Sequence, residues 1–149
     1  MKKLISAALL FVMIFVLGAC ETASEPTKTC YLEISAADAI VFEKLASDKR
    51  ELLPEDGIIL ARCEVKFSEG ENAYEVVLRT LQQNKIHYDA DTASKYFKGI
   101  SNLYSFDCGE YSGWSYYVNG ELPMVGMADY ALSEGDEILL TYITDFTKE

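Results

Sequence analysis

The segment from Tyr111 to Gly120 concentrates aromatic side chains and glycines, and these residue types favour molecular recognition. In an extended strand, Trp114 and Tyr116 share one face, whereas Tyr117 lies on the other. Large rings with polar tips suit a binding surface, although the same two rings could instead pack under a helix. The ligand-binding candidates are the aromatic residues of this segment and the asparagine of its closing turn: Tyr111, Trp114, Tyr116, Tyr117 and Asn119.

Residue types that enzymes use for acid–base or nucleophilic chemistry are sparse. His87 is the only histidine, which excludes catalytic and metal sites that need two. The segment Gly109–Gly113 carries its serine in the fourth position, whereas a nucleophile elbow needs it in the centre. Paired acids such as Asp89 and Asp91 do not lie in a loop with the ligands that calcium requires. The sequence therefore predicts a protein that is not an enzyme and holds neither a metal nor a cofactor.

The start of the chain has the features of an export signal. Met1–Lys3 is basic, the apolar run that follows is shorter than the roughly 20 residues that span a bilayer, and Leu17–Ala19 offers small residues for cleavage. Cleavage by a general signal peptidase would account for these features. The cysteine that follows them resembles the lipidation site of bacterial lipoproteins, so we predict a lipoprotein signal peptide over residues 1–19 and a diacylglycerol thioether on Cys20.

This anchor would place the mature protein at the cell membrane, on its extracytoplasmic face, with residues 20–29 as a flexible polar tether. The mature chain has 130 residues (149 minus 19), enough for one domain, which we place at residues 30–146. Loss of Lys2 and Lys3 changes the net charge from −11 to −13. Such an acidic domain repels nucleic acid, which we exclude as a partner.

With Cys20 lipidated, three cysteines remain, and an exported protein can form disulfides. We predict a Cys63–Cys108 disulfide, with Cys30 free or paired elsewhere. Because three cysteines cannot all pair within one chain, one is left over. The spacing contains no CxxC or Cys/His pattern, which argues against a zinc site.

The first half of the chain predicts two strands and two helices. Cys30–Ser35 alternates as a strand, and a helix capped by Ser35 is expected to run to about Leu53, with Ile40, Val41, Phe42 and Leu45 toward the core. A second strand covers Ile58–Phe67, with Ala61 among its inward residues. The clearest helix starts after Asn72, where Glu75 completes a capping box, and ends near Asn84.

The second half predicts three strands. Residues 86–102 have no clear pattern, although Tyr96, Phe97 and Ile100 are compatible with a short helix or turn that ends near Gly99. Leu103–Asp107 favours a strand. Trp114–Val118 is a strand closed by an Asn-Gly turn, and Glu137–Thr144 is the last strand. The order of elements predicts the α+β class: a single β-grasp-like domain whose mixed sheet is packed by one main helix, with a second helix inserted between the first two strands.

Two motifs carry a resemblance to a known family. Gly113–Gly120 resembles the G-W-x-Y-x-V-N-G signature of the transcobalamin C-terminal-like family, also described as a domain of unknown function. Glu69–Asn72 with Val76–Leu78 looks like the family's entry from loop to helix, and Leu103–Gly109 is similar to the stretch before its tryptophan. The resemblance covers about residues 30–146. Unlike many members, the chain has Met127 and Ile143 where a further cysteine pair is common, and Ser115 where methionine is common.

The resemblance implies a β-grasp-like domain of exported, often surface-anchored bacterial proteins. In the animal vitamin B12 carriers, a similar domain closes over one face of the corrin ring, next to a helical barrel for which this chain has no room. We therefore predict a lipid-anchored, extracytoplasmic binding module without catalytic activity, which presents a small-molecule ligand such as a corrinoid to an uptake system. The alternative is a structural or interaction module of the cell envelope, in which a sheet edge pairs with another exported protein.

Overall fold

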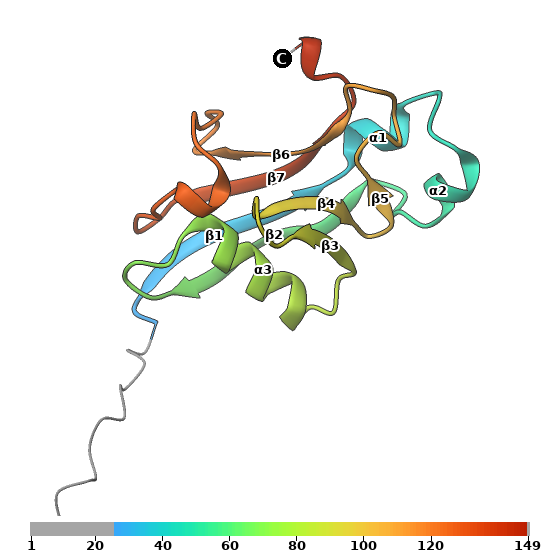
Figure 1. Ribbon diagram of the computed structural model, residues 1–149. Helices are drawn as coiled ribbons and strands as arrows, with labels where there is room; N and C mark the ends of the chain where they lie inside the picture. The colour runs from blue at the N-terminus through green and yellow to red at the C-terminus, as the bar shows by residue number, and fades with distance from the viewer. Residues whose placement is uncertain (1–25, 149) are drawn as a thin grey trace, which may run out of the picture.

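The computed structural model describes residues 26–148, which form a four-stranded mixed sheet and a three-stranded antiparallel sheet (Figure 1). In the larger sheet, β1 (Lys28–Ser35) lies antiparallel to β2 (Ile58–Phe67) and parallel to β7 (Glu137–Ile143). β6 (Gly113–Val118) closes the sheet antiparallel to β7, giving the order β2-β1-β7-β6. The mixed sheet agrees with the predicted class. The predicted signal peptide and Cys20 lie outside the described residues.

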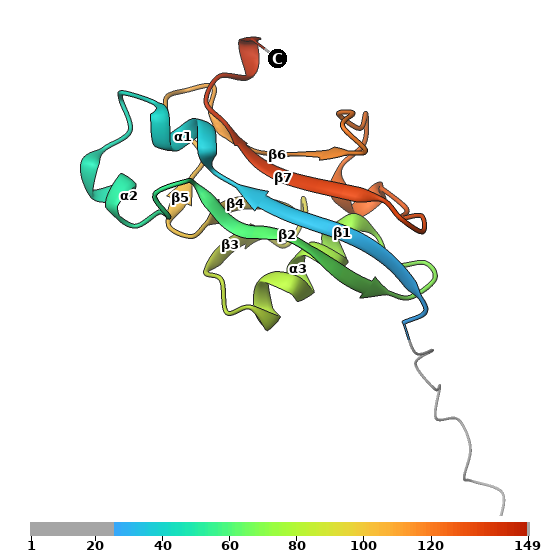
Figure 2. The same ribbon diagram turned by 180° about the vertical axis from the view of Figure 1, so that it is seen from behind.

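Within residues 26–148, one face of the large sheet is covered and the other is open. α3 (Ala73–Gln83) and the three-stranded sheet lie on the same side of it (Figure 1), and the view from behind shows the strands of the large sheet in front of them (Figure 2). Tyr74 of α3 stacks on Phe97 with ring centroids 5.0 Å apart, which joins the helix to the smaller sheet. The core lies between these two layers, and Cys30, Leu32 and Ile34 of β1 are buried in it, as their alternation predicted.

The main helix confirms its predicted boundaries and its cap. Asn72 Oδ1 accepts a hydrogen bond from the Glu75 amide at 3.0 Å, and Glu75 Oε2 accepts one from the Asn72 amide at 3.1 Å. This capping box satisfies two amides that the first helical turn leaves without partners. The helix ends at Gln83, with Asn84 as its C-cap.

The predicted helix from Ser35 to Leu53 is wrong. Two short helices, α1 (Ala37–Val41) and α2 (Ser47–Glu51), take its place. The backbone adopts an extended conformation at Phe42 (φ −75°, ψ 115°). The Arg50 guanidinium donates to the Phe42 carbonyl at 2.8 Å and satisfies an acceptor that a continuous helix would have used. Val41, expected in the core, is exposed because the helix ends there.

The short helix or turn expected around Tyr96, Phe97 and Ile100 is also wrong. β3 (Tyr88–Asp91) and β4 (Tyr96–Ile100) form a hairpin, and β5 (Leu103–Tyr104) adds a third strand that is shorter than predicted. The Asp91 carboxylate accepts hydrogen bonds from the Ala93 and Ser94 amides and builds the turn of this hairpin. These backbone bonds and the Lys98 ammonium lower the pKa of Asp91.

A β-bulge interrupts the pairing of β2 with β1. Leu32 pairs with Cys63 and Ile34 pairs with Leu60, so β2 has one extra residue between these pairs. The bulge leaves both Ala61 and Arg62 exposed, which explains why Ala61 does not share the inward face as predicted. At the start of the sheet, β1 begins at Lys28, so the last two residues of the predicted tether belong to the strand.

The β6–β7 connection is long and contains a short 3₁₀ helix, η1 (Met127–Asp129). It begins with the predicted Asn-Gly turn, in which Asn119 and Gly120 both have positive φ (54° and 81°). After β7, a second 3₁₀ helix, η2 (Phe146–Lys148), ends the described part of the chain. Within residues 26–148, no helix combines the length and apolar character that crossing a bilayer requires.

Candidate functional site

The aromatic strand β6 divides the predicted ligand-binding residues between two faces of the sheet. Trp114 and Tyr116 are buried on the covered side, whereas Tyr117 lies half-buried on the open side. The predicted alternation along this strand is therefore confirmed. It also means that the aromatic residues do not form one continuous binding surface.

Trp114 belongs to the core, which was the alternative left open by the sequence. Its side chain is only 2% exposed, and the indole Nε1–H donates to the Leu103 carbonyl at 2.9 Å. The ring also meets Tyr142 edge to face, with centroids 5.4 Å apart. Both contacts fix the indole, so Trp114 supplies a rigid wall to the space beside it.

That space is an apolar pocket of about 280 Å³ between β4, β6 and the loop 121–132. Trp114, Tyr116 and Leu140 line it from the large sheet, and Tyr96 and Phe97 line it from β4. The remaining lining residues come from the β3–β4 turn and the β6–β7 loop: Ser94, Lys95, Ser115, Leu122, Pro123, Val125, Gly126 and Met127. Lys95 is the only charged residue among those that line the pocket, so its chemistry suits an apolar or flat ligand.

The rim of this pocket is exposed and apolar. Leu122 is 51% exposed and Val125 is 48% exposed, and Met124 between them is 96% exposed. Contiguous exposed apolar surface often marks an interaction site. The Tyr116 hydroxyl donates to the Val125 carbonyl at 2.6 Å and holds the rim against the sheet. Burial raises the pKa of the Tyr116 phenol, so it remains a hydrogen-bond donor.

Sequence reasoning missed this loop. It assigned no element or function to the residues between Gly120 and Ser133, because they show neither helical nor strand periodicity. The available signal was the run Leu122–Val125, four apolar residues directly after a tight turn. For Tyr96 and Phe97 the sequence predicts a short helix or turn, and it does not place them beside Trp114.

The other candidates lie away from the pocket. Asn119 has a structural position, because its Nδ2 donates to Asp136 at 2.9 Å and its Oδ1 accepts from the Glu137 amide at 3.0 Å. Tyr111 is exposed in the loop before β6, where its carbonyl accepts a hydrogen bond from the Phe146 amide at 2.8 Å. The structure thus brings two of the five candidates, Trp114 and Tyr116, into one site.

The predicted Cys63–Cys108 disulfide is not formed. Cys30, Cys63 and Cys108 are free thiols. The Cys63 Sγ donates to the Leu32 carbonyl across the β1–β2 pair, whereas Cys108 is buried in the loop between β5 and β6, near the Tyr142 hydroxyl. The two side chains are engaged in different parts of the core. Burial raises the pKa of both Cys30 and Cys108 to about 11, so these thiols are protonated at neutral pH.

No acid–base or metal site emerges among residues 26–148. His87 contacts the Tyr104 hydroxyl at 3.0 Å and, in the described part of the chain, has no acidic partner. The described residues contain no group of three or more histidine, cysteine, aspartate or glutamate side chains that could hold a metal ion.

Fold and pocket together define an α+β domain that combines a mixed sheet, one capped helix and an apolar pocket with an exposed rim. The chain belongs to the family "Domain of unknown function (DUF4430)", whose model matches residues 70–144. This match runs from the loop before α3 to the end of β7 and includes the whole lining of the pocket. The family resemblance seen in the sequence is therefore confirmed. No curated protein matches the chain.

Two solved structures resemble the chain at low sequence identity. Haptocorrin in complex with Cbi superposes with a TM-score of 0.51 at 12% identity, over 87% of this chain and 29% of haptocorrin. A protein from Ruminococcus gnavus ATCC 29149, described as a candidate metal-binding protein, has a TM-score of 0.46 at 13% identity, over 78% of this chain and 97% of that protein. The chain thus spans less than a third of haptocorrin, and the likeness to haptocorrin shows the fold alone.

Proposed function

We propose that this chain is a lipid-anchored, extracytoplasmic binding module without catalytic activity, which holds an apolar or flat small molecule such as a corrinoid for an uptake system. The observation that supports the proposal is the exposed apolar rim, Leu122–Val125, beside a pocket walled by Trp114 and Tyr116. The sheet order β2-β1-β7-β6, with its parallel central pair and α3 on one face, supports the β-grasp-like interpretation of the fold.

The size of the pocket limits how a ligand would bind. Its volume of about 280 Å³ lies just below the range of pockets that enclose a drug-sized molecule. A larger ligand would insert one apolar group between Trp114 and Tyr116 and rest the remainder on the rim. This arrangement suits a module that covers one side of a corrinoid, because haptocorrin, solved with Cbi, is more than three times as long as the region matched here.

Corrinoid binding is expected to depend on the rim. The full chain in a neutral maltoside detergent is titrated with cobinamide and with cobalamin, following the corrin absorbance and the fluorescence of Trp114, the only tryptophan. We expect a micromolar or tighter dissociation constant, weakened at least tenfold by the double substitution Leu122→Ser and Val125→Ser. The two substitutions remove apolar area worth about 1.5 kcal/mol or more each when fully buried.

Leu52→Ser is the matched control, because Leu52 is also an exposed leucine but lies after α2, outside the pocket lining. It should leave the dissociation constant unchanged. Unchanged spectra with both corrinoids would eliminate a corrinoid as the ligand. Full affinity in the double variant would eliminate the pocket as its site.

The anchor is tested separately from the ligand. Cys20→Ser removes the thiol that a diacylglycerol thioether requires, so we expect the protein to lose radiolabelled fatty acid and to leave the membrane fraction. Cys63→Ser is the control, because it removes another cysteine while keeping a donor for the Leu32 carbonyl, and it should keep the label. A Cys20→Ser protein that still carries labelled lipid would contradict the proposed anchor.

An exposed aromatic group favours the alternative function, an interaction module of the cell envelope. Phe106, Tyr111 and Phe146 are 70%, 55% and 42% exposed and line one apolar hollow together with Tyr96. Substitution of Tyr111 by serine distinguishes the two functions. It would release a co-purifying exported protein if the alternative holds, and it would leave corrinoid binding intact if the apolar pocket is the functional site.

A further inference from the structure

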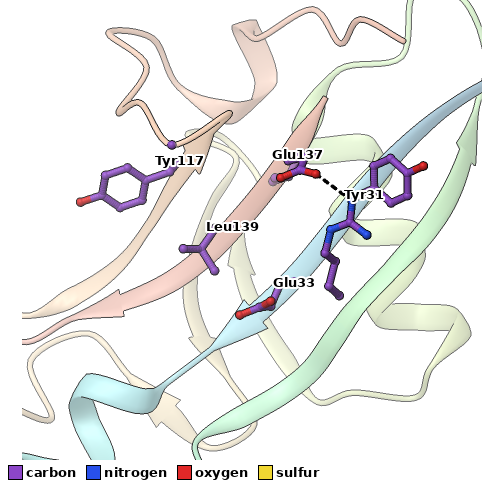
Figure 3. A pocket seen from close by; sticks show the side chains of 8 residues that line it. Tyr31, Glu33, Tyr117, Glu137 and Leu139 are labelled. Carbon is purple, nitrogen blue, oxygen red and sulfur yellow. Dashed lines mark hydrogen bonds and ion pairs between the residues drawn. The ribbon is translucent and has the colours of Figure 1, made fainter. Parts of the chain in front are cut away.

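The open face of the large sheet carries a second hollow, separate from the apolar pocket. It has a volume of about 390 Å³ and lies over all four strands, on the side seen from the front in Figure 2. Figure 3 shows its side chains at close range. Six of the residues that line it supply its chemistry: Tyr31, Glu33, Arg62, Tyr117, Glu137 and Leu139. We call this hollow the open-face trough.

Strand register places these side chains in two rows across the sheet. Glu33 pairs with Leu139 between β1 and β7, and Leu139 pairs with Tyr117 between β7 and β6. In the next row, Tyr31 of β1 pairs with Glu137 of β7. Because directly paired residues project from the same face, the first row presents a carboxylate, an aliphatic floor and an aromatic ring side by side (Figure 3).

The second row already holds a cation. The Arg62 guanidinium lies 3.9 Å from the centroid of the Tyr31 ring, and its Nη2 donates to Glu137 Oε1 at 2.7 Å. A ring face together with a carboxylate is a standard environment for an organic cation. The bulge in β2 leaves Arg62 exposed beside these partners. The Arg62 side chain therefore shows that this face accommodates a cation between an aromatic ring and a carboxylate.

In the first row, Glu33 lacks such a cation within the described part of the chain. Glu33 is half-buried, and among residues 26–148 no ion pair or side-chain hydrogen bond reaches its carboxylate. The trough has two carboxylates, Glu33 and Glu137, and a single guanidinium, which is engaged with Glu137. One negative charge is therefore in excess, and it lies next to the aliphatic side chain of Leu139.

We propose that the open-face trough binds a small organic cation with an apolar body, such as an aryl- or alkylammonium compound. Its charge would pair with Glu33, and its body would lie on Leu139 against the Tyr117 ring. The geometry repeats what Arg62 does with Glu137 and Tyr31 in the neighbouring row. Charge complementarity selects this ligand class over anions, which the excess carboxylate repels. This site is independent of the apolar pocket, which lies on the other side of the sheet.

Benzyltrimethylammonium is a suitable probe because it joins a permanent charge to an aromatic body. Amide chemical shifts of the full chain in neutral detergent are followed during titration, with benzyl alcohol as the neutral analogue. We expect saturable shifts on β1 and β7 with the cation and none with the alcohol. Glu33→Gln should weaken binding at least fivefold, whereas Glu55→Gln, which removes the same charge from an exposed turn, should leave it unchanged.

Arg62→Ala provides a second test, in which the affinity for the cation is expected to increase. Removal of the guanidinium leaves Glu137 without its cation and uncovers the Tyr31 ring, so the trough should bind benzyltrimethylammonium more tightly, by about fivefold or more. This gain cannot result from misfolding. Equal affinity in the parent chain, Glu33→Gln and Arg62→Ala would overturn the proposal. Shifts that appear only with a lysine-containing peptide, and not with the free cation, would overturn it as well.

Discussion

Substitution of Trp114 by alanine is expected to lower the free energy of unfolding by about 3 to 5 kcal/mol, the range for large aromatic residues in protein cores. The indole is almost fully buried, it meets Tyr142 edge to face, and its Nε1–H donates to the Leu103 carbonyl. Truncation would leave a cavity next to the apolar pocket and an acceptor without its donor. Trp114→Phe retains a ring and loses the donor, so a smaller decrease, about 1 to 3 kcal/mol, is expected.

Urea unfolding followed by far-UV circular dichroism measures this effect, since the substitution removes the only fluorescent indole. Tyr111→Ala is the control, because Tyr111 belongs to the same aromatic segment but is exposed, and it should change stability by no more than about 0.5 kcal/mol. A decrease below about 1 kcal/mol for Trp114→Ala would show that the indole does not pack as the structure places it. The core role of Trp114 would then have to be abandoned.

Elements whose formation depends on local sequence were predicted well. The capping box at Asn72 and Glu75 and the Asn119–Gly120 turn each rest on hydrogen bonds or backbone angles that a few neighbouring residues determine. The alternation of β1 and β6 was equally readable, because one side of each strand is buried. These local signals also carried the family resemblance, and the matched region begins two residues before Asn72.

Elements that depend on distant partners were not predictable in this way. The break between α1 and α2 depends on Arg50 reaching back to the Phe42 carbonyl, a contact that no periodicity encodes. The β3–β4 hairpin is short, and its inward ring, Phe97, stacks on the Tyr74 ring of α3, a partner far away in the sequence. Helical propensity and short apolar runs mislead where tertiary contacts decide the outcome.

The sequence predicted the part of the candidate site that lies on β6, but not the part that lies on the loop. Sequence spacing correctly separated Trp114 and Tyr116 from Tyr117, but it could not place Leu122 or Val125 beside them, because the loop that carries these residues has no regular geometry. Contacts with other elements hold this loop, among them the hydrogen bond from the Tyr116 hydroxyl to the Val125 carbonyl and the one from the Ala73 amide to the Tyr130 carbonyl. The open-face trough could not be predicted for a related reason, since its charged residues, Glu33, Arg62 and Glu137, come from three strands that only the sheet register brings together.

Unfolding at alkaline pH is expected to depend strongly on two buried thiols. Burial, supported by the nearby charges of Asp136 and Asp107 respectively, raises the pKa of Cys30 and Cys108 from 9.0 to about 11. In the unfolded chain these thiols would ionise near pH 9, whereas in the folded chain they keep their protons up to about pH 11. Between these values the unfolded state binds fewer protons, so the free energy of unfolding falls as pH rises.

Below pH 9 the stabilising contribution is fully present, and from pH 9 to 11 each thiol should lose about 3 kcal/mol of it, because one pKa unit corresponds to about 1.4 kcal/mol. Urea midpoints measured from pH 7 to 11 in a thiol-free reducing agent test this slope. The double variant Cys30→Ala and Cys108→Ala is less stable at pH 7, because it loses packing, but its stability should depend less on pH between 9 and 11. Lysines and tyrosines titrate in both proteins, so the difference between the two slopes isolates the thiols. If the stability of the two proteins changes with pH in parallel, the two sulfurs are accessible to water in the folded chain. If the two stability curves converge as pH rises, both sulfurs are buried in the core, as the structure places them.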